Sequence, residues 1–232
     1  MVSARLNIAL LDEMLSEGMQ SSQSLVDAST HLLAHSVSSE EIAELENARQ
    51  VFEAEARSVA AARYLQSLGE ALQRINQYPE ATANLEKAMR VFEEKGESVR
   101  FAQCLQRLAE ILQATNQYPD ATTKFELARQ VFEAKGESVT AARCLQRLGE
   151  MLQATNQYPD ATNKFEQAIR VFEEKGESLA EAECLQRLAE MLQATNHYRD
   201  AKTKFEQAMW VFIIERELVG AFQCLQRLIE LR

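Results

Sequence analysis

Glycine and proline are scarce in this chain, with seven and three among 232 residues. Because these two residues mark most turns, their scarcity leaves long stretches for regular structure. Ala, Leu, Glu, Gln and Arg fill those stretches, and all of them favour helices. No apolar run approaches the roughly 18 residues of a membrane-spanning helix, and no GxxxxGK[ST] phosphate-binding loop occurs. The composition therefore predicts an all-α protein.

Positive charge is also in short supply, because 25 Lys and Arg face 35 Asp and Glu, a net charge of −10. Nucleic-acid binding by phosphate neutralisation needs a basic face, so we expect no nucleic-acid partner. The first stretch, MVSARLNIALLDEMLSEGM, places acidic residues beside a short apolar segment. This resembles an amphipathic capping helix at 1–19 more than a signal peptide. Without a targeting signal we expect a cytoplasmic protein with no membrane partner.

The sequence repeats itself every 40 residues. Between 101–139 and 141–179, only ten of the 39 aligned positions differ. Self-similarity at a period of about 20–50 residues is typical of stacked repeat arrays. We place four repeats at 60–219, a degenerate copy at 20–59 and a half-repeat helix at 220–232.

Each repeat is predicted to form two antiparallel helices joined by a short turn. In the copy at 140–179, the first helix is expected from about 139 to 155, with the Ser138 hydroxyl accepting a hydrogen bond as its N-cap. Asn156 is suited to end this helix in a left-handed conformation. Gly176 is expected to end the second helix in the same way.

Several residues at fixed spacing carry a family resemblance. Leu148-Gly149, followed by Ala161, Phe165 and Ala168, is similar to the pattern of tetratricopeptide repeats. In two sister copies alanine, which is also small, replaces the glycine. The resemblance implies a right-handed α-solenoid whose first helices line a concave, partner-binding face.

The 40-residue period is longer than the family's usual one, and phrases such as F-E-x-K-G-E-S resemble arrays in fungal nucleotide-binding STAND (NLR-like) proteins. Because the chain has no Walker A loop, it would correspond to the sensor-like array of such a receptor.

A polar stripe recurs on the first helix of each repeat, at i, i+4 and i+7, away from the leucine-rich side. With the neighbouring arginines and one extra glutamate, the polar stripe comprises Gln66, Glu70, Gln73, Gln106, Arg107, Glu110, Gln113, Gln146, Arg147, Glu150, Gln153, Glu183, Gln186, Arg187, Glu190 and Gln193.

Two interpretations of the polar stripe stay open. One is a solvated helix face whose Arg–Glu pairs add a few tenths of a kcal/mol. The other is a groove for an extended peptide or a partner helix. Members of the family that clamp a carboxylate use lysine and asparagine where this chain has glutamine and glutamate. The resemblance therefore implies a basic or mixed-charge partner.

Cysteine and histidine give little sign of metal or catalytic chemistry. The four cysteines occur once per repeat, too far apart for disulfides and without CxxC spacing, so they are interpreted as packing residues. His31 and His35 share a helical spacing but have no third ligand nearby in sequence. No Ser/Cys–His–Asp grouping stands out. We expect no metal, no cofactor and no enzymatic activity.

The repeat pattern breaks at VFIIEREL, residues 211–218. The terminating glycine becomes Arg216 and the serine of the next helix becomes Leu218, so a continuous helix is expected from about Asp200 to Arg232. Such a helix would carry apolar side chains away from their own core, which favours a domain-swapped homodimer. The candidate self-association residues are Trp210, Ile213, Ile214, Leu218, Leu225, Leu228 and Ile229.

The break at 211–218 is also compatible with two simpler arrangements. The last helix would stack on a further repeat of a longer array, or it would act as an ordinary solvating cap. The function favoured by the whole sequence is a non-enzymatic scaffold that binds a protein or peptide on its concave face. The alternative is a self-association module of a larger STAND/NLR-like receptor.

Overall fold

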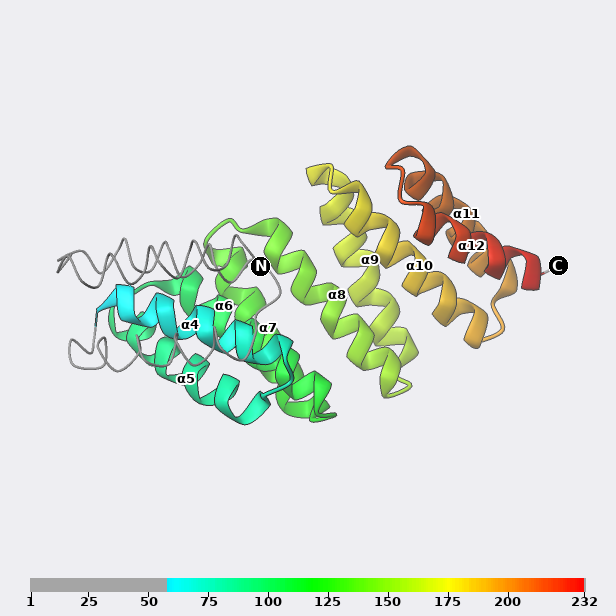
Figure 1. Ribbon diagram of the computed structural model, residues 1–232. Helices are drawn as coiled ribbons and strands as arrows, with labels where there is room; N and C mark the ends of the chain where they lie inside the picture. The colour runs from blue at the N-terminus through cyan, green and yellow to red at the C-terminus, as the bar shows by residue number, and fades with distance from the viewer. Residues whose placement is uncertain (1–57, 232) are drawn as a thin grey trace, which may run out of the picture. The chain divides into compact units, whose positions relative to one another are not determined.

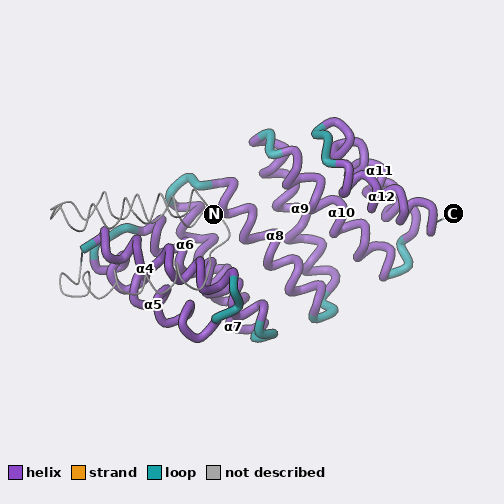
Figure 2. The backbone as a smooth tube through the Cα atoms, viewed as in Figure 1, coloured by secondary structure: helices purple, strands orange, loops and turns teal. Residues whose placement is uncertain are grey.

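The computed structural model describes residues 58–231. The predicted capping helix at 1–19, His31, His35 and almost all of the repeat predicted at 20–59 lie outside the described residues. Within the described part the all-α prediction is confirmed, because helices and short turns account for all of it (Figure 2). No helix in this part combines the length and apolar character that crossing a bilayer requires.

The described residues form nine helices, which fall into two compact units (Figure 1). The first unit, up to Thr115, contains α4 (Val59–Arg74), α5 (Tyr78–Glu94) and α6 (Ser98–Ala114). The second unit, from Asn116, contains α7 (Tyr118–Ala134), α8 (Ser138–Ala154), α9 (Tyr158–Lys175), α10 (Ser178–Ala194), α11 (Tyr198–Ile214) and α12 (Leu218–Glu230). In the second unit each helix packs against the next one along the chain, and α8 also contacts α10.

Left-handed residues end the helices, as the sequence predicts. Asn156 after α8 has φ 59°, and Gly176 after α9 has φ 71°. The Tyr158 hydroxyl donates a hydrogen bond of 2.7 Å to the Asn156 side-chain oxygen, which stabilises the turn that leads into α9. Pro in the first turn of α9 removes an N–H that would have no helical partner.

The N-cap predicted at Ser138 is wrong. Ser138 is the first residue of α8, Glu137 precedes it as the N-cap, and no side chain accepts a hydrogen bond there. The Ser138 hydroxyl instead donates to the Gly136 carbonyl oxygen at 3.4 Å. The reason is the tight turn from α7, in which the Glu137 N–H bonds back to the Phe132 carbonyl at 2.9 Å and places Glu137 at the cap position.

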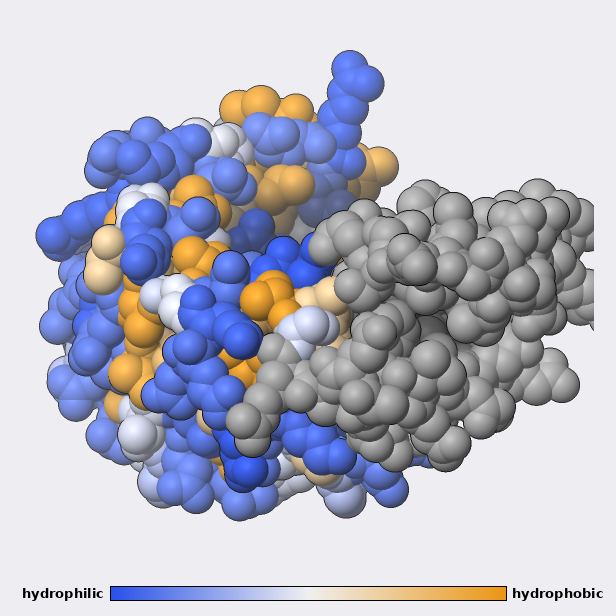
Figure 3. All heavy atoms as spheres, turned by 90° about the vertical axis from the view of Figure 1, so that its left-hand side faces the viewer, coloured by the Kyte–Doolittle hydropathy of each residue, from blue (hydrophilic) through white to orange (hydrophobic). Residues whose placement is uncertain are grey.

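The core of each repeat lies between its own first and second helices. Phe165 on α9 is fully buried in a cluster with Leu145 of α8. A β-carbon added at Gly149 would lie 3.0 Å from the Phe165 ring, so this position admits only a small residue. On the side of the protein that Figure 3 shows, polar residues cover most of the described surface.

The continuous helix predicted from Asp200 to Arg232 is wrong, because α11 ends at Ile214 and α12 begins at Leu218. Arg216 takes the left-handed conformation, with φ 60°, that glycine takes in the earlier turns. The Glu217 carboxylate accepts from the Val219 N–H at 3.1 Å and so provides a side-chain cap that α8 and α10 lack.

Packing holds α12 back against α11 of the same chain. Cys224 is fully buried in the last core cluster, and Leu228 packs against that cluster. Leu228, expected among the self-association residues, therefore belongs to the core. The Gly220 backbone approaches the Phe212 ring so closely that an added β-carbon would lie 2.9 Å from it. In this structure α12 makes these contacts within its own chain.

Candidate functional site

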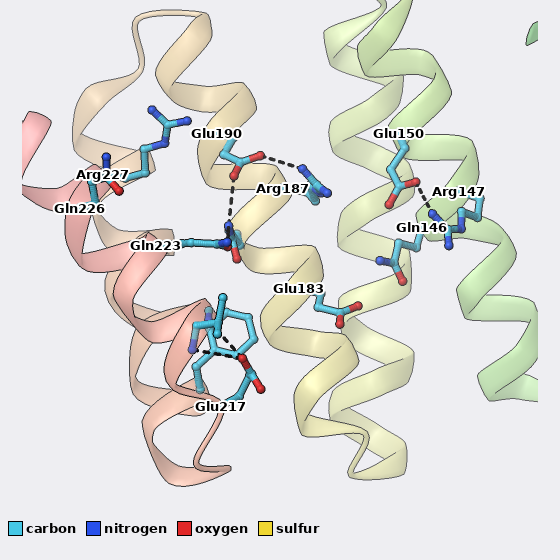
Figure 4. A pocket seen from close by; sticks show the side chains of 14 residues that line it. Gln146, Arg147, Glu150, Glu183, Arg187, Glu190, Glu217, Gln223, Gln226 and Arg227 are labelled. Carbon is cyan, nitrogen blue, oxygen red and sulfur yellow. Dashed lines mark hydrogen bonds and ion pairs between the residues drawn. The ribbon is translucent and has the colours of Figure 1, made fainter. Parts of the chain in front are cut away.

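A hollow of about 680 Å³ lies on the second unit, bordered by the first helices α8, α10 and α12 (Figure 4). Seven of the predicted polar-stripe residues line it: Gln146, Arg147, Glu150, Glu183, Gln186, Arg187 and Glu190. Gln153 and Gln193, one or two turns further along, do not line it. Stacking of successive first helices thus brings together side chains that are 40 residues apart in the sequence.

The share of α12 in the hollow was not predicted from the sequence. Gln223, Gln226 and Arg227 line it, together with Glu217 and Val219. Gln223, Gln226 and Arg227 stand at the positions that Glu183, Gln186 and Arg187 occupy one repeat earlier. The 40-residue repeat was therefore sufficient to place these α12 residues on the polar stripe. The expectation that α12 exchanges with another chain led the prediction away from them.

Arginine and glutamate pair along each first helix that lines the hollow. Arg147 and Glu150 are 2.9 Å apart on α8, and Arg187 and Glu190 are 3.2 Å apart on α10 (Figure 4). Arg227 makes the same contact, at 3.0 Å, with Glu230 on α12. Such exposed pairs stabilise a helix only slightly, but they do neutralise most of the charge along the hollow.

Glutamine links neighbouring first helices. The Gln186 amide donates to the Gln223 side-chain oxygen at 3.2 Å, across from α10 to α12. It also donates to Glu190 at 3.1 Å on its own helix. These amides therefore hold successive repeats together as well as facing the hollow.

The first unit shows the same links between α4 and α6. Gln73 donates to Glu110 at 3.1 Å, and Gln66 donates to Gln103 at 3.4 Å. Arg107 bridges Glu70, at 3.5 Å, and Glu110, at 3.0 Å. Most polar groups of the stripe in this unit are thus engaged with one another. Gln106, which donates to Glu110, belongs to the same network.

Glu183 differs from the other glutamates of the hollow. It is exposed on α10, and among the described residues it has no hydrogen-bond or ion-pair partner, as the absence of a dashed line to it in Figure 4 reflects. Glu217, by contrast, caps the N-terminus of α12. A free carboxylate at the edge of a polar hollow is suited to receive a cationic group.

Negative charge gathers around the first turns of α10. Burial, and then the charge of Glu173, raise the pKa of the Glu181 carboxyl. Burial, followed by the charges of Glu150, Glu183 and Glu181, raises the pKa of the Cys184 thiol. Burial is the main cause of both shifts, and the neighbouring carboxylates add to it.

The four cysteines are buried free thiols, in agreement with the prediction that they are packing residues. Burial, and then the charge of Glu70, raise the pKa of Cys104 to about 12. Burial and Glu190 raise that of Cys224 to about 11. Protonated, buried thiols are poor nucleophiles.

Stacked helix pairs with this spacing of small and aromatic residues define an α-helical array of tetratricopeptide-like repeats. A family model described as tetratricopeptide repeat matches residues 101–174. The model of the soluble NSF attachment protein family matches residues 3–130, more than half of the sequence, and the chain belongs to this family. No curated protein matches the chain by sequence.

Several solved structures share the fold. Aspartyl phosphate phosphatase F of Bacillus subtilis superposes with a TM-score of 0.79 and 17% identity over 93% of this chain, which spans only 58% of that protein. A putative kinesin light chain of Podospora anserina with nearly identical tetratricopeptide-like repeats gives 0.67 and 20% identity, covering 83% of this chain and 97% of its own. A Rap protein complexed with competence and sporulation factor gives 0.59 and 13%, covering 89% and 61%. At these identities the likeness shows the fold alone.

Proposed function

We propose that this repeat scaffold binds a segment of a partner protein in the hollow formed by α8, α10 and α12, with a lysine or arginine of that segment against Glu183. The observation that carries the proposal is the free, exposed carboxylate of Glu183 in a hollow whose three arginines already pair with other glutamates. An incoming cation would gain a partner there without displacing an existing one.

The remaining lining favours a segment of mixed character. The amide side chains of Gln146, Gln223 and Gln226 offer donors and acceptors to an extended backbone. Arg187 and Arg227, although paired, leave guanidinium N–H groups for an acidic residue of the segment. The structure of a Rap protein complexed with competence and sporulation factor supports the idea that this fold binds such partners.

The cellular setting that we infer is the cytoplasm, with the chain acting as the sensor-like array of a STAND/NLR-type receptor. The 40-residue period and the phrasing of the repeats support this setting. The scaffold acts by binding and not by catalysis, in keeping with thiols that burial keeps protonated.

A direct test is fluorescence anisotropy with a labelled lysine-rich peptide and a glutamate-rich peptide of equal length. The lysine-rich peptide should bind more tightly, and Glu183→Gln should weaken it by about fivefold, which corresponds to about 1 kcal/mol. Added salt should weaken binding to the wild type more than to this variant.

The matched control is Glu206→Gln, the same change of charge at an exposed site on α11 outside the hollow. Equal affinity of Glu183→Gln and wild type, or equal binding of the two peptides, would show that the hollow does not recognise cations.

A further inference from the structure

Four large apolar residues form a stripe on the outer side of α12, which lies beside α11 at the C-terminal end in Figure 1. Leu218, Phe222, Leu225 and Ile229, here called the α12 stripe, are between 45% and 74% exposed. Their spacing of four, three and four residues places them on one face of the helix. Ile213 and Ile214 at the end of α11 are also exposed.

Another face of α12 is already packed. Cys224 is buried against α11, and Leu228 and Leu231 pack against the same cluster. The α12 stripe is thus a second apolar face on a helix that is already packed on another side.

In the earlier repeats the corresponding face receives the second helix of the same repeat. The counterparts on α10 of Phe222, Leu225 and Ile229 are Ala182, Leu185 and Ala189. These three are buried in one cluster with Phe205 of α11. The two alanines are small because the phenylalanine ring fills the space above them.

Large residues on the α12 stripe prevent the same packing. On α8 the slot that corresponds to Ile229 holds Gly149, and even a methyl group there would lie 3.0 Å from the Phe165 ring. An isoleucine in that slot, and a phenylalanine two turns earlier, would collide with the aromatic ring of a further second helix of this kind. A second helix with an aromatic ring at the position of Phe165 would therefore not pack on α12 as α9 packs on α8.

We propose that a second copy of this chain covers the α12 stripe, with the two α12 helices antiparallel about a two-fold axis. Apolar residues alternating at three and four residues form the seam along which two helices interlock. In the antiparallel arrangement Leu218 meets Ile229 of the other copy, and Phe222 meets Leu225, so large residues face large residues at every step. The contact is isologous and therefore closed.

Charge also favours a second copy. A chain of net charge −10 repels its own copies over most of its surface. The α12 stripe contains no charged residue, and Val219 and Gln226, which flank it, are uncharged as well. Two copies can therefore meet along the α12 stripe without burying a charged side chain between them. The net charge of −10 also opposes binding to an anionic lipid surface, the other occupant for such a face.

This dimer differs from the domain swap expected from the sequence. Each α12 keeps its contacts with its own α11, and only the outer face is shared. The residues of α12 that line the hollow, Gln223 and Arg227 among them, are not members of the α12 stripe. Dimerisation would thus give one particle two hollows, and a partner with two basic segments would bind with added avidity.

The first measurement is light scattering coupled to size exclusion over a series of protein concentrations. The wild type should move from 26.3 kDa at the lowest concentrations to twice that mass at the highest. Phe222→Glu should raise the dissociation constant of the dimer by about tenfold or more. Because Phe222 is exposed in the monomer, the variant should keep the far-UV circular dichroism of the wild type.

The matched control is Leu127→Glu on α7, since Leu127 is a similarly exposed apolar residue far from α12 in sequence. It should leave the dimer unchanged. A wild type that stays at the mass of one chain throughout, or equal weakening by both variants, would overturn the proposal. A monomer that floats with neutral or anionic vesicles would identify a lipid surface as the occupant instead.

Cross-linking tests the direction of the two helices. The native cysteines are buried, so Leu218→Cys and Ile229→Cys each add one accessible thiol. A short bismaleimide should join the two variants in a mixture more readily than it joins either variant to itself. Preferential self-linking of each variant would contradict the antiparallel arrangement. Neither experiment depends on peptide binding, so each proposal can fail separately.

Discussion

The contact between α8 and α9 makes a sharp prediction about Gly149. Replacing this glycine by alanine in a helix interior is worth about 0.8–1 kcal/mol of helix propensity. Against that gain, the new methyl group would lie 3.0 Å from the Phe165 ring, so the ring has to move by a few tenths of an ångström. The larger of the two effects decides whether Gly149→Ala stabilises or destabilises the protein.

The next repeat along the chain indicates that Gly149→Ala is stabilising. Ala189 occupies the equivalent position on α10 and is fully buried in one cluster with Phe205, which is fully buried as well. The aromatic ring evidently accommodates one methyl group without opening the core. We therefore expect Gly149→Ala to stabilise the protein by about 0.5–1 kcal/mol, measured by guanidinium unfolding followed by circular dichroism.

Gly69 provides the contrast. A methyl group there would lie 2.6 Å from the branched Cγ of Leu85 and 3.2 Å from the Ala81 backbone oxygen, neither of which moves easily. Gly69→Ala should therefore lose about 1–3 kcal/mol, and Gly149→Ile, which introduces the residue present at position 229, should lose at least as much. If Gly149→Ala were as destabilising as Gly69→Ala, the inference from the sister repeat would be refuted.

Three further predictions concern an ion pair on α7, the turn between α11 and α12, and the buried cysteines. Arg129 holds the pKa of the Glu126 carboxyl below its usual range through a hydrogen-bonded ion pair. The contribution of this ion pair to the free energy of unfolding is present above the ordinary carboxyl pKa and is lost as pH falls through the lowered pKa. Arg129→Ala should therefore cost up to about 0.5 kcal/mol near pH 7 and nothing near pH 2, as measured by paired urea titrations. Arg216→Gly should raise stability by about 1 kcal/mol in thermal unfolding, since glycine adopts φ 60° freely, and a loss would contradict this account of the turn. Iodoacetamide near neutral pH should leave Cys184 and Cys224 unmodified in the folded chain, and mass spectrometry showing rapid labelling of Cys184 would disprove its burial.

Local patterns explain why most of the fold could be predicted. The left-handed ends at Asn156 and Gly176 depend on residues that tolerate positive φ, and this property is readable from the chain. The slot at Gly149 is recognisable because small residues recur there every 40 positions. Ser138 was misassigned by one position, since the cap depends on how tightly the preceding helix closes its last turn.

The candidate site could be predicted only in part. Helical spacing indicated that Gln146 and Glu150 share a polar face, and the hollow confirms that they lie together. The sequence shows why Glu150 is paired at 2.9 Å, because Arg147 stands three residues before it, whereas Ala180 stands three residues before Glu183. The sequence does not show that Glu183 has no partner elsewhere in the described part of the chain, because this depends on the stacking of helices 40 residues apart.

The sequence by itself determined an all-α array of repeats, their turns and their polar stripe, because each depends on residues close together in the chain. Only the tertiary structure decided the course of the chain at 211–218. There the loss of glycine and serine favours a continuous helix locally, and a left-handed Arg216 costs about 1–2 kcal/mol. Burial of Cys224 and Leu228 against α11 and the close approach of Gly220 to Phe212 outweigh that cost. Those contacts join residues on two different helices, so the folded chain alone reveals that α12 turns back and leaves its second apolar face outward.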